Sequence, residues 1–554
     1  MKDKIIQALN RASGIKDPNL EFSSKSEFGD YTTNIALHSK NPRKTAEELV
    51  LKLKKNQELK DVVDKIEIAG PGFINFHLST KALITNLSQI IEEKENFGKV
   101  TVKKAKKIIL EFTDPNPFKE FHIGHVYTNT VGESLSRILE ANGAEVHRVN
   151  YQGDVGLHVA KSLWGMIKKM QEENLKIEDL EKRNLKERVK FMGEGYVLAS
   201  NLYKENESIK KEINELNKKI FDQDKSILDI YNKGRSWSLE YFETIYKRLG
   251  TKFNNYYFES EVGKVGEKIV IENLETGVFQ KSQGAIIFPG KKHGLHDRVF
   301  INSLGLPTYE AKELGLAPTK YKDFKYDQSI IITGNEINEY FKVLIKAMTI
   351  IYPDLGKKTI HIGHGMVRLP EGKMSSRTGN IITGEMLLDE VKNNAAEIDK
   401  DSSEAVAVGA VKYAFLKVGI GQDIVFNIGE SLSLQGNSGP YLQYTVARTN
   451  SLLAKSSKLN LKISNELKLN PEEQQVLREL VKFPEIIEFA AFNYSPNILC
   501  EYLFNLAQRY NGFYNKHKIL EGDNIEFRLQ LTFAANVVLK NGLNLLGIAT
   551  PKKM

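Results

Sequence analysis

The sequence predicts an α/β domain with a parallel sheet, preceded by a small α+β domain and followed by an all-α bundle. An apolar run at residues 106–112, helical apolar spacing over residues 131–139 and a strand-like run at residues 145–151 form a strand–helix–strand unit. The chain has 554 residues, and a single core rarely grows beyond roughly 250 to 300 residues. We therefore expect several domains around this unit.

Residues 1–90 are expected to form the small α+β domain. They combine amphipathic helical spacing with a strand-like run at residues 66–76 that is broken at Gly70-Pro71-Gly72. A Lys- and Glu-rich stretch that is suited to a linker ends this region.

The parallel sheet is expected in two halves. Residues 105–160 form the first half, in which Asn142-Gly143 ends the helix of the strand–helix–strand unit. Residues 286–385 form the second half, with apolar strands at residues 329–333 and 358–362.

Residues 161–285 are expected to form a mainly helical insertion between the two halves. The segment is dense in Lys, Glu and Asn and has long helical patterns as far as Leu249, and it becomes β-rich over residues 256–288. Its lysines are more typical of a solvated face than of an RNA-binding patch.

Residues 386–554 are expected to form the helical bundle. Asn470, Pro471 and Glu473 have the residue types of an N-cap, a first-turn proline and a capping-box glutamate, and helically spaced apolar residues follow them. A helix is therefore expected to begin at this position.

Composition narrows the possible classes of protein. The formal charge of +8 favours a polyanionic partner, although interspersed Lys and Glu are equally typical of a solvated surface. The single cysteine, Cys500, excludes an intrachain disulfide and a zinc cluster of several thiolates, and its apolar helical surroundings predict a buried side chain.

No segment of the sequence is typical of export or of a membrane. The N-terminal residues lack the apolar core of a secretory signal, and no stretch approaches the ~18 apolar residues of a membrane span. We expect a cytoplasmic protein that does not bind membranes.

The tetrapeptide HIGH at residues 122–125 lies between a strand-end loop and the start of a helix. Helix amides and the imidazoles of His122 and His125 can face phosphate there, and Gly124 lets a nucleotide approach the backbone. The same tetrapeptide recurs at residues 361–364, but no amphipathic helix follows it. We interpret this second copy as structural.

A polar loop at residues 371–380 can close over a triphosphate. It contains Lys373, Ser375, Ser376 and Arg377 between glycines. Attack of a carboxylate on an α-phosphorus builds charge on phosphoryl oxygens, which fixed cations and donors stabilise. The alternative interpretation is an ordinary basic turn.

Together, the tetrapeptide and the loop resemble the HIGH and KMSKS motifs of class I aminoacyl-tRNA synthetases, and the surrounding sequence resembles arginyl-tRNA synthetases. The resemblance extends over nearly the whole chain, and its first and last blocks are what single out arginine. It rests on Phe28-Gly29-Asp30-Tyr31 with Asn34, residues 69–76, Glu111-Phe112, Pro115-Asn116, Lys119, Gly132-Glu133, Gly153-Asp154, residues 434–444 with Arg448, and residues 545–554.

This resemblance implies a Rossmann-like catalytic domain, an N-terminal additional domain that contacts the tRNA elbow, and a C-terminal anticodon-binding bundle. It implies ATP as the nucleotide, with Mg²⁺ carried by the nucleotide and no metal held by the protein. The implied ATP contacts are His122, Gly124, His125, Lys373, Ser375, Ser376 and Arg377. His122, His125, Lys373 and Lys119 are the implied catalytic residues. Whether Lys119 or Arg377 is the second cation is left open.

A guanidinium presents a planar fork of donors, so its pocket requires a carboxylate for bidentate pairing. The resemblance places Tyr309 and Glu313 there, where the family has aspartate in place of Glu313, and Asn116 and Glu111 at the substrate backbone. Other departures from the family pattern are Ile337, Tyr340 and His158, and Glu336 is expected to supply a compensating polar contact. The alternative for Tyr309 and Tyr340 is a core aromatic with a satisfied hydroxyl.

The resemblance implies tRNA(Arg), L-arginine and ATP as partners, and we expect a monomer. Interleaved aromatic and basic residues toward the C-terminus suit stacking on unpaired bases, and about half of these aromatics are expected to be buried. The tRNA-binding candidates are Tyr31, Asn34, Phe73, Tyr441, Tyr444, Arg448, Arg509 and Tyr514.

Three further functions stay open on the sequence alone. Another class I synthetase is the nearest, although the thiolate zinc sites of the cysteinyl and methionyl enzymes cannot be built from one cysteine. An adenylating nucleotidyltransferase that does not use tRNA would not need the terminal blocks. A noncatalytic tRNA-binding relative would tolerate loss of His122, His125 and Lys373, which are all present.

Overall fold

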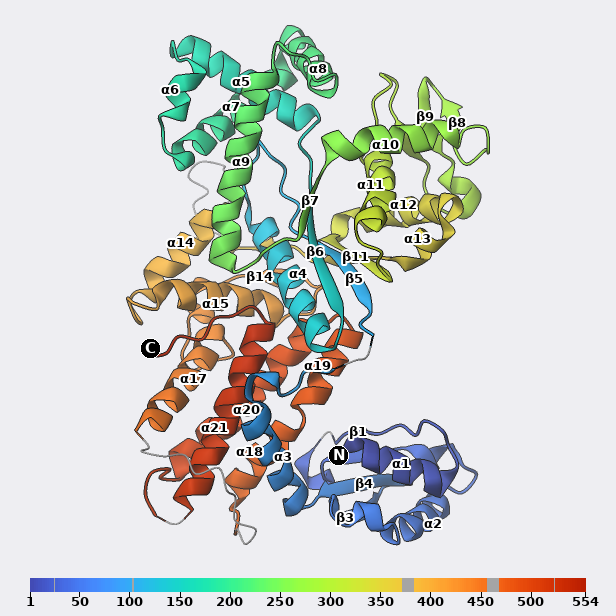
Figure 1. The fold of residues 1–554 in the computed structure, drawn as a ribbon, viewed down its shortest axis with the longest axis vertical. Helices are drawn as coiled ribbons and strands as arrows, with labels where there is room; N and C mark the ends of the chain where they lie inside the picture. Colours follow the sequence, from blue (N-terminus) through green and yellow to red (C-terminus); the bar gives the residue numbers. More distant parts are fainter. Residues whose placement is uncertain (24, 102–103, 371–382, 456–467, 523) are drawn as a thin grey trace.

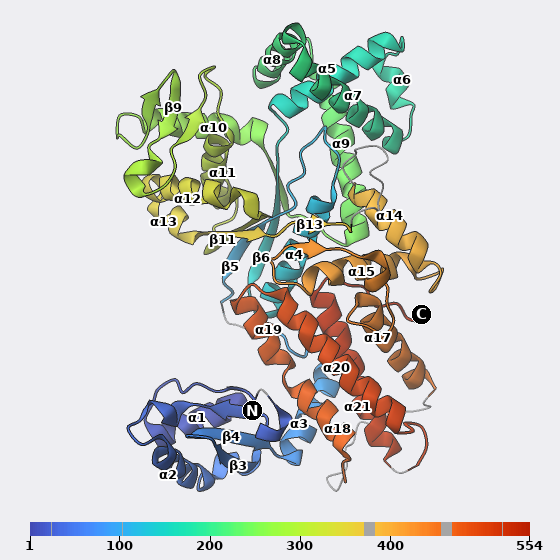
Figure 2. The same cartoon turned by 180° about the vertical axis from the view of Figure 1, so that it is seen from behind.

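The computed structural model describes residues 1–23, 25–101, 104–370, 383–455, 468–522 and 524–554. The molecule is elongated (Figure 1). The N-terminal domain lies at one end beside a helical bundle, and the catalytic domain extends beyond the bundle into two lobes. The view from behind shows the same arrangement (Figure 2).

The N-terminal domain is an antiparallel four-stranded sheet with strand order β1-β2-β4-β3, covered by helices. Strands β3 and β4 form a hairpin across the expected break, where Gly70 has a φ of 51° and Gly72 of 150°. The elements are α1 (Lys2–Ser13), β1 (Glu21–Phe22), β2 (Tyr31–Thr33), α2 (Pro42–Lys54), β3 (Val63–Ala69), β4 (Phe73–Leu78) and α3 (Thr80–Glu93).

The catalytic domain contains a five-stranded sheet with the order β12-β11-β5-β6-β7, in which every neighbouring pair is parallel. The chain first adds β6 and β7 on one side of β5, and it later adds β11 and β12 on the other side. Ligands bind at such a reversal, outside the carboxyl ends of the strands. The elements are β5 (Lys107–Glu111), α4 (Ile123–Ala141), β6 (Glu145–Gln152), β7 (Asn255–Phe258), β11 (Gln328–Gly334) and β12 (Thr359–His364).

A helical insertion separates β6 from β7 and forms one upper lobe in Figure 1. Because β7 pairs with β6, the chain rejoins the main sheet at Asn255, earlier than the expected end of the insertion at residue 285. The insertion helices are α5 (Leu157–Glu172), α6 (Ile177–Glu181), α7 (Leu185–Glu205), α8 (Glu207–Phe221) and α9 (Leu228–Leu249).

The segment expected to be β-rich contains a helix instead. Helix α10 (Glu259–Glu272) buries Val262, Ile269 and Val270, whose helical spacing was masked by their β-branched side chains. The rest of this second lobe comprises β8 (Gln280–Ser282), β9 (Ala285–Phe288), β10 (Arg298–Ile301), α11 (Tyr309–Asp323), α12 (Asn338–Ile351) and α13 (Pro353–Lys358).

The C-terminal region is helical. Helix α18 begins with the expected capping box, in which the Asn470 side chain accepts from the Glu473 amide and the Glu473 carboxylate accepts from the Asn470 amide. Cys500 is buried, as expected. The elements are β13 (Val367–Arg368), α14 (Gly384–Ala395), α15 (Ser403–Leu416), β14 (Ile424–Val425), α16 (Ile428–Ser431), α17 (Gly439–Ala454), α18 (Pro471–Val481), α19 (Phe483–Phe492), α20 (Pro496–Lys516) and α21 (Ile525–Leu545).

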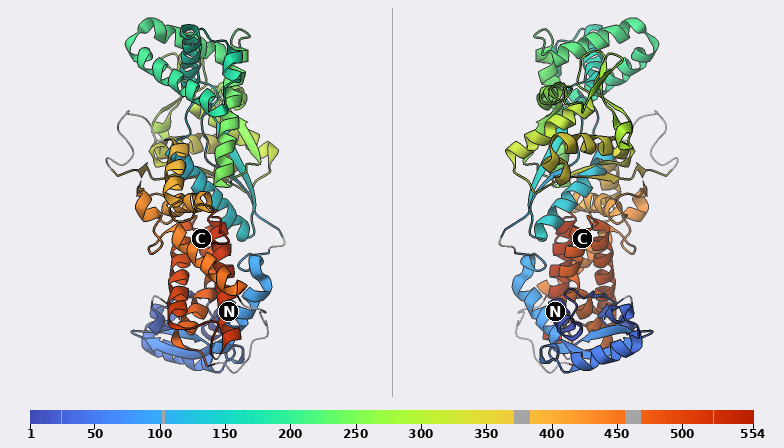
Figure 3. Two further views of the ribbon diagram at one scale, coloured as in Figure 1. Left: turned by 90° about the vertical axis from the view of Figure 1, so that its left-hand side faces the viewer. Right: turned by 90° about the vertical axis from the view of Figure 1, so that its right-hand side faces the viewer.

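Helix α4 connects the sheet to the bundle, and the side views in Figure 3 show the bundle directly below the catalytic domain. Helix α4 packs against α19, α20 and α21. Ser134 donates to the carbonyl of Leu545 at 3.1 Å, and Arg137 donates to the carbonyl of Asn544 at 3.0 Å. The end of the chain is therefore attached to this helix.

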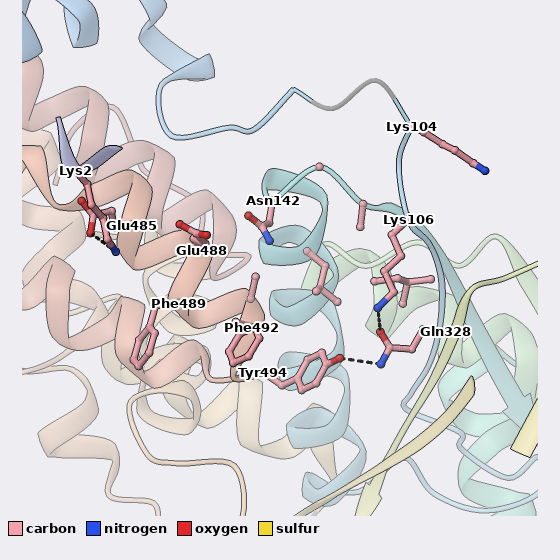
Figure 4. Close-up of a pocket in the computed structure, with 15 residues that line it drawn as sticks. Lys2, Lys104, Lys106, Asn142, Gln328, Glu485, Glu488, Phe489, Phe492 and Tyr494 are labelled. Atoms are coloured by element: carbon pink, nitrogen blue, oxygen red, sulfur yellow. Dashed lines mark hydrogen bonds and ion pairs between the residues drawn. The ribbon is translucent and has the colours of Figure 1, made fainter. Parts of the chain in front are cut away.

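A groove of about 610 Å³ lies at the opposite, amino edge of the sheet, against α19 (Figure 4). Lys106 donates to the Gln328 side-chain oxygen at 2.7 Å, and Gln328 donates to the Tyr494 hydroxyl at 2.9 Å. Phe489 and Phe492 are exposed beside it. These hydrogen bonds join the sheet to the bundle.

Candidate functional site

A pocket of about 550 Å³ opens at the carboxyl edge of the sheet, where the strand order reverses. It brings together all five residues that the sequence assigned to the arginine side of the site. Those residues are Glu111, Asn116, Tyr309, Glu313 and Glu336. The pocket is also lined by Asp114, Tyr151, Gly153, Glu259, Arg298, Glu310, Thr333, Ile337, Tyr340 and Phe341.

Two of the carboxylates in the pocket are neutralised by buried lysines. Glu111 pairs with Lys320 at 2.6 Å, and Glu259 pairs with Lys312 at 2.6 Å. All four side chains are at least 95% buried. Removal of one partner of such a pair leaves an uncompensated buried charge, so these pairs fix the carboxylates in position.

Glu313 differs from these two residues. Its side chain forms no hydrogen bond or ion pair with the residues that the structure describes. Burial, and then the nearby Glu111 carboxylate, raise the pKa of Glu313 well above its ordinary value. A cation that enters the pocket would lower this raised pKa, because an opposite charge favours the ionised carboxylate.

The loop after β5 shapes the floor of the pocket. Asn116 accepts from the Gly153 amide at 3.1 Å, and Asp114 accepts from the Tyr151 amide at 2.7 Å. Asp114 has a φ of 46°, a conformation that Asp tolerates better than most residues. A Cβ at Gly153 would lie 2.4 Å from the Asn116 oxygen, so the contact requires glycine.

The sequence interpretation did not assign several of the lining residues. Glu259 follows β7, in the segment that the sequence predicts to belong to the insertion, and Arg298 lies on β10 in the second lobe. The Arg298 guanidinium lies 3.5 Å from Glu310 and 5.8 Å from the centroid of the Tyr340 ring. No local motif marks these residues, and only the position of the strands brings them to the pocket.

Helix α4 carries the first HIGH tetrapeptide at its start. His122 is the N-cap residue, and its amide donates to Nδ1 of His125 at 3.2 Å. The two imidazole rings stack with centroids 3.7 Å apart. A Cβ at Gly124 would lie 3.0 Å from the His122 ring, so glycine preserves this stacking.

This geometry defines the protonation of His125. Since Nδ1 accepts a hydrogen bond, the neutral ring carries its proton on Nε2 and can donate there. Burial, followed by His122 and Lys119, lowers the pKa of His125 well below its ordinary value. Burial and Lys119 also lower the pKa of His122. Both rings are therefore neutral donors near pH 7.

The second HIGH tetrapeptide lies within strand β12, as its sequence context indicates. Nε2 of His361 lies 2.7 Å from the Thr333 hydroxyl, and its ring stacks on Phe341 at 3.9 Å. Nδ1 of His364 donates to the Gly365 carbonyl at 2.7 Å, and Nε2 contacts the Thr128 hydroxyl at 2.7 Å. These histidines have structural partners.

The predicted KMSKS-like residues lie outside the described residues. Lys373, Ser375, Ser376 and Arg377 belong to residues 371–382, between β13 and α14. Their roles stay predictions.

His158 makes the fold sensitive to acid. Its Nε2 donates to the Gly153 carbonyl at 2.9 Å, and burial lowers its pKa to about 3. Below the unfolded pKa of about 6.5, the unfolded chain takes up a proton that the folded chain excludes. This histidine therefore lowers the free energy of unfolding by up to about 1.4 kcal/mol per pH unit as the pH falls from 6.5 toward 3.

We expect His158→Gln to reduce the stability lost between pH 7 and pH 5 by about 1 to 2 kcal/mol, since a glutamine amide can still donate to Gly153. Urea unfolding at the two pH values measures this difference. His38→Gln, at an exposed histidine, is the control and should leave the loss unchanged. An equal loss in wild type and His158→Gln would contradict the assignment.

The tRNA-binding candidates of the N-terminal domain differ in exposure. Tyr31 is 1% exposed, and its hydroxyl donates to Glu485 of the bundle. Arg478 pairs with the adjacent Asp30. Tyr31 thus supports the domain interface, and a base could stack on it only if this interface opened. Asn34 is partly exposed and Phe73 is 37% exposed.

The bundle candidates form a cluster on α17 and α20. The Arg448 guanidinium lies 4.9 Å from the ring centroids of both Tyr444 and Tyr514. The Asn511 side chain donates to the Tyr441 hydroxyl and accepts from Arg448. Tyr510 and Phe513 are buried, whereas Tyr441, Tyr444 and Tyr514 are partly exposed. Arg509 is exposed and bonds Gln475 at 3.3 Å.

Three families of known proteins match successive parts of the chain. The family described as arginyl tRNA synthetase N terminal domain matches residues 1–78. The family of class I (R) tRNA synthetases, catalytic domain, matches residues 86–428. The DALR anticodon binding domain matches residues 442–554. None of the described helices is long and apolar enough to cross a membrane.

Individual proteins match over almost the whole length. An arginine–tRNA ligase of Treponema denticola is 32% identical over 95% of this chain and 93% of the relative. An arginine–tRNA ligase of Borreliella afzelii is 33% identical over 97% of this chain and 94% of the relative. The fold is similar to that of Thermus thermophilus arginyl-tRNA synthetase, with a TM-score of 0.81 and 23% identity over 100% and 99% of the two chains. The fold is also similar to that of Plasmodium falciparum arginyl-tRNA synthetase, with a TM-score of 0.78 and 21% identity over 100% of this chain and 98% of that chain.

Proposed function

Because the chain belongs to the arginyl-tRNA synthetases, a family of class I aminoacyl-tRNA synthetases, we propose that its acidic pocket binds L-arginine and that helix α4 binds ATP. The protein is an enzyme that joins arginine to tRNA at the expense of ATP. Neither a class I synthetase for a different amino acid nor a nucleotidyltransferase that does not use tRNA accounts for matches to all three families.

One observation carries the assignment of the pocket. Glu313 is a partly buried carboxylate whose side chain has no partner among the described residues, and it lines a pocket in which two other carboxylates, Glu111 and Glu259, are fixed by lysines. A guanidinium entering there would supply the missing donors in a planar fork. Tyr309 and Asn116 line the same pocket, and Asn116 would orient the substrate backbone.

The Glu111–Lys320 pair refines the expected role of Glu111. Its carboxylate already accepts a hydrogen bond from the buried Lys320. We propose that its remaining lone pairs accept from the α-amino group of arginine. Glu336 is exposed at the rim and would contact the substrate from the solvent side.

The ATP phosphates would lie at the start of α4. The first helix amides, the Nε2 proton of His125 and the His122 ring would face phosphate oxygens. The arginine carboxylate attacks the α-phosphorus, the bond to the bridging oxygen of the β-phosphate breaks, and pyrophosphate leaves. We assign Lys119 and the loop with Lys373, Ser375, Ser376 and Arg377 to stabilising this charge.

The arginyl group then passes to tRNA. A hydroxyl of the 3′-terminal adenosine attacks the carbonyl carbon, and AMP leaves. The anticodon side of tRNA(Arg) is assigned to the cluster of Tyr441, Tyr444, Arg448, Arg509 and Tyr514, and the elbow to the domain that carries Asn34 and Phe73. We further propose that the enzyme acts as a cytoplasmic monomer.

Magnesium is proposed to arrive with ATP. Among the residues that the structure describes, no group of three or more His, Cys, Asp or Glu is arranged to hold a metal. A phosphate-bound Mg²⁺ that keeps several waters does not require such a group. It would neutralise phosphate charge during adenylate formation.

Amino-acid-dependent exchange of labelled pyrophosphate into ATP tests this function. We expect exchange with arginine alone among the twenty amino acids, and efficient exchange only when tRNA is present, as the family resemblance implies. Exchange with a different amino acid would refute the pocket assignment. Full exchange without tRNA would refute the proposed coupling between tRNA binding and adenylate formation.

A further inference from the structure

Tyr340 is a pocket residue to which the proposed function gives no role. It lies in the first turn of α12 and lines the arginine pocket together with Glu313 of α11. Helices α11 and α12 are in contact in the second lobe (Figure 1). Tyr340 is only partly buried, so a ligand bound in the pocket can reach it.

Aromatic neighbours hold the Tyr340 ring in place. Phe341 packs against it edge-to-face, with centroids 5.1 Å apart, and itself stacks on His361 at 3.9 Å. The guanidinium of Arg298 lies 5.8 Å from the centroid of the Tyr340 ring. At this range a guanidinium is attracted to the face of an aromatic ring, so the pocket already holds one guanidinium beside this tyrosine.

The hydroxyl of Tyr340 has no hydrogen-bond partner in the described part of the chain. Tyr340 is therefore not the core aromatic with a satisfied hydroxyl that the sequence allows as an alternative. Carboxylates lie near it instead, because burial, and then Glu313 and Glu310, raise the pKa of Tyr340 well above its ordinary value. The hydroxyl is thus a neutral group that can both donate and accept.

A bound guanidinium needs more acceptors than Glu313 offers. The group presents five N–H donors in one plane, and a bidentate carboxylate accepts from two of them. A tyrosine oxygen in the same pocket can accept from a third, and its own proton stays free to donate to a carboxylate. The ammonium group of lysine presents its donors from a single nitrogen and lacks this planar edge.

We propose that Tyr340 is a specificity-determining residue for arginine, whose hydroxyl accepts from a guanidinium N–H that Glu313 leaves free. The inference rests on the proposed function, in which Glu313 pairs with the guanidinium. It adds a second acceptor to that site, on the helix that forms the other wall of the pocket. Tyr340 thereby favours arginine over lysine.

Binding of arginine and of lysine to the full-length enzyme tests this contact. Tyr340→Phe should raise the Kd for arginine by about 10- to 150-fold, the usual worth of a hydrogen bond to a charged group. The inhibition constant of lysine, measured as a competitor of arginine, should stay within about twofold, because an ammonium does not use this hydroxyl. Isothermal titration measures both quantities, and the KM for ATP should stay unchanged.

Tyr257→Phe is the matched control. Tyr257 is buried on β7, and its hydroxyl donates to Asp323 at 3.1 Å, away from the residues that line the pocket. Loss of this hydroxyl should lower the thermal unfolding midpoint of the free enzyme and leave the Kd for arginine unchanged. Tyr340→Phe removes a hydroxyl that has no such partner, so it should leave the midpoint unchanged.

Three results would overturn the proposal. An unchanged Kd for arginine in Tyr340→Phe would remove the hydroxyl from the site. An equal loss of arginine and lysine binding would make Tyr340 a structural support of the pocket. A midpoint that falls as far as in Tyr257→Phe would show that the hydroxyl has a partner within the protein. A wild-type enzyme that does not bind arginine would instead refute the proposed function, so the two failures are distinguishable.

Discussion

His125→Ala should reduce the turnover number of tRNA arginylation by about 100- to 1,000-fold, the usual cost of removing one donor to transition-state charge. In the structure its Nδ1 accepts from the His122 amide, so the neutral ring carries its proton on Nε2, where it can donate. The loss should appear in kcat at saturating substrates, while the Kd for tRNA stays within twofold. Steady-state arginylation and filter binding measure the two quantities.

His361→Ala is the matched control, because it removes a histidine from the same tetrapeptide. His361 is hydrogen-bonded to Thr333 and stacked on Phe341, so its loss should cost stability and less than tenfold in kcat. Comparable losses of kcat in the two variants would contradict the assignment of distinct roles to the two copies.

Glu313→Gln should weaken arginine binding by about 150- to 4,000-fold, since removing one partner of a buried charge pair costs about 3 to 5 kcal/mol. The glutamine keeps the volume of the side chain and removes only the charge that the guanidinium requires. Isothermal titration with arginine measures the affinity, and the KM for ATP should stay unchanged.

Two variants define the specificity of that effect. Glu313→Asp keeps the charge and shortens the side chain by one methylene, so its loss should be below tenfold if charge dominates over reach. Glu339→Gln removes a carboxylate that is paired with Lys342 outside the pocket, and it should have no effect. An unchanged affinity in Glu313→Gln would remove this residue from the arginine site.

The features predicted correctly from the sequence are local ones. The helix start at His122 and the capping box at Asn470 each depend on residues within one turn of each other, and the strand–helix–strand unit lies in one contiguous stretch of the chain. The five candidate pocket residues lie together because Glu111 ends β5, Asn116 lies in the loop after it and Glu336 lies in the 3₁₀ turn (Asn335–Ile337) after the neighbouring β11. Tyr309 and Glu313 lie one helical turn apart on α11.

The features that the sequence did not predict depend on distant partners. Lys320 is 209 residues from Glu111, and Lys312 is 53 residues from Glu259. A buried lysine has no sequence signature that distinguishes it from a solvated one. Tyr31 was assigned to RNA from a local motif, but its burial depends on Glu485, which lies in another domain.

The attachment of the last residues to α4 has a consequence for protein engineering. The helix that begins after His122 is held at Ser134 and Arg137 by carbonyls of Leu545 and Asn544. The bundle is therefore not an interchangeable module. A chimera that takes its bundle from a relative must also recover the complementary surface of α4, or the exchange meant to alter tRNA recognition will disturb the geometry of adenylate formation.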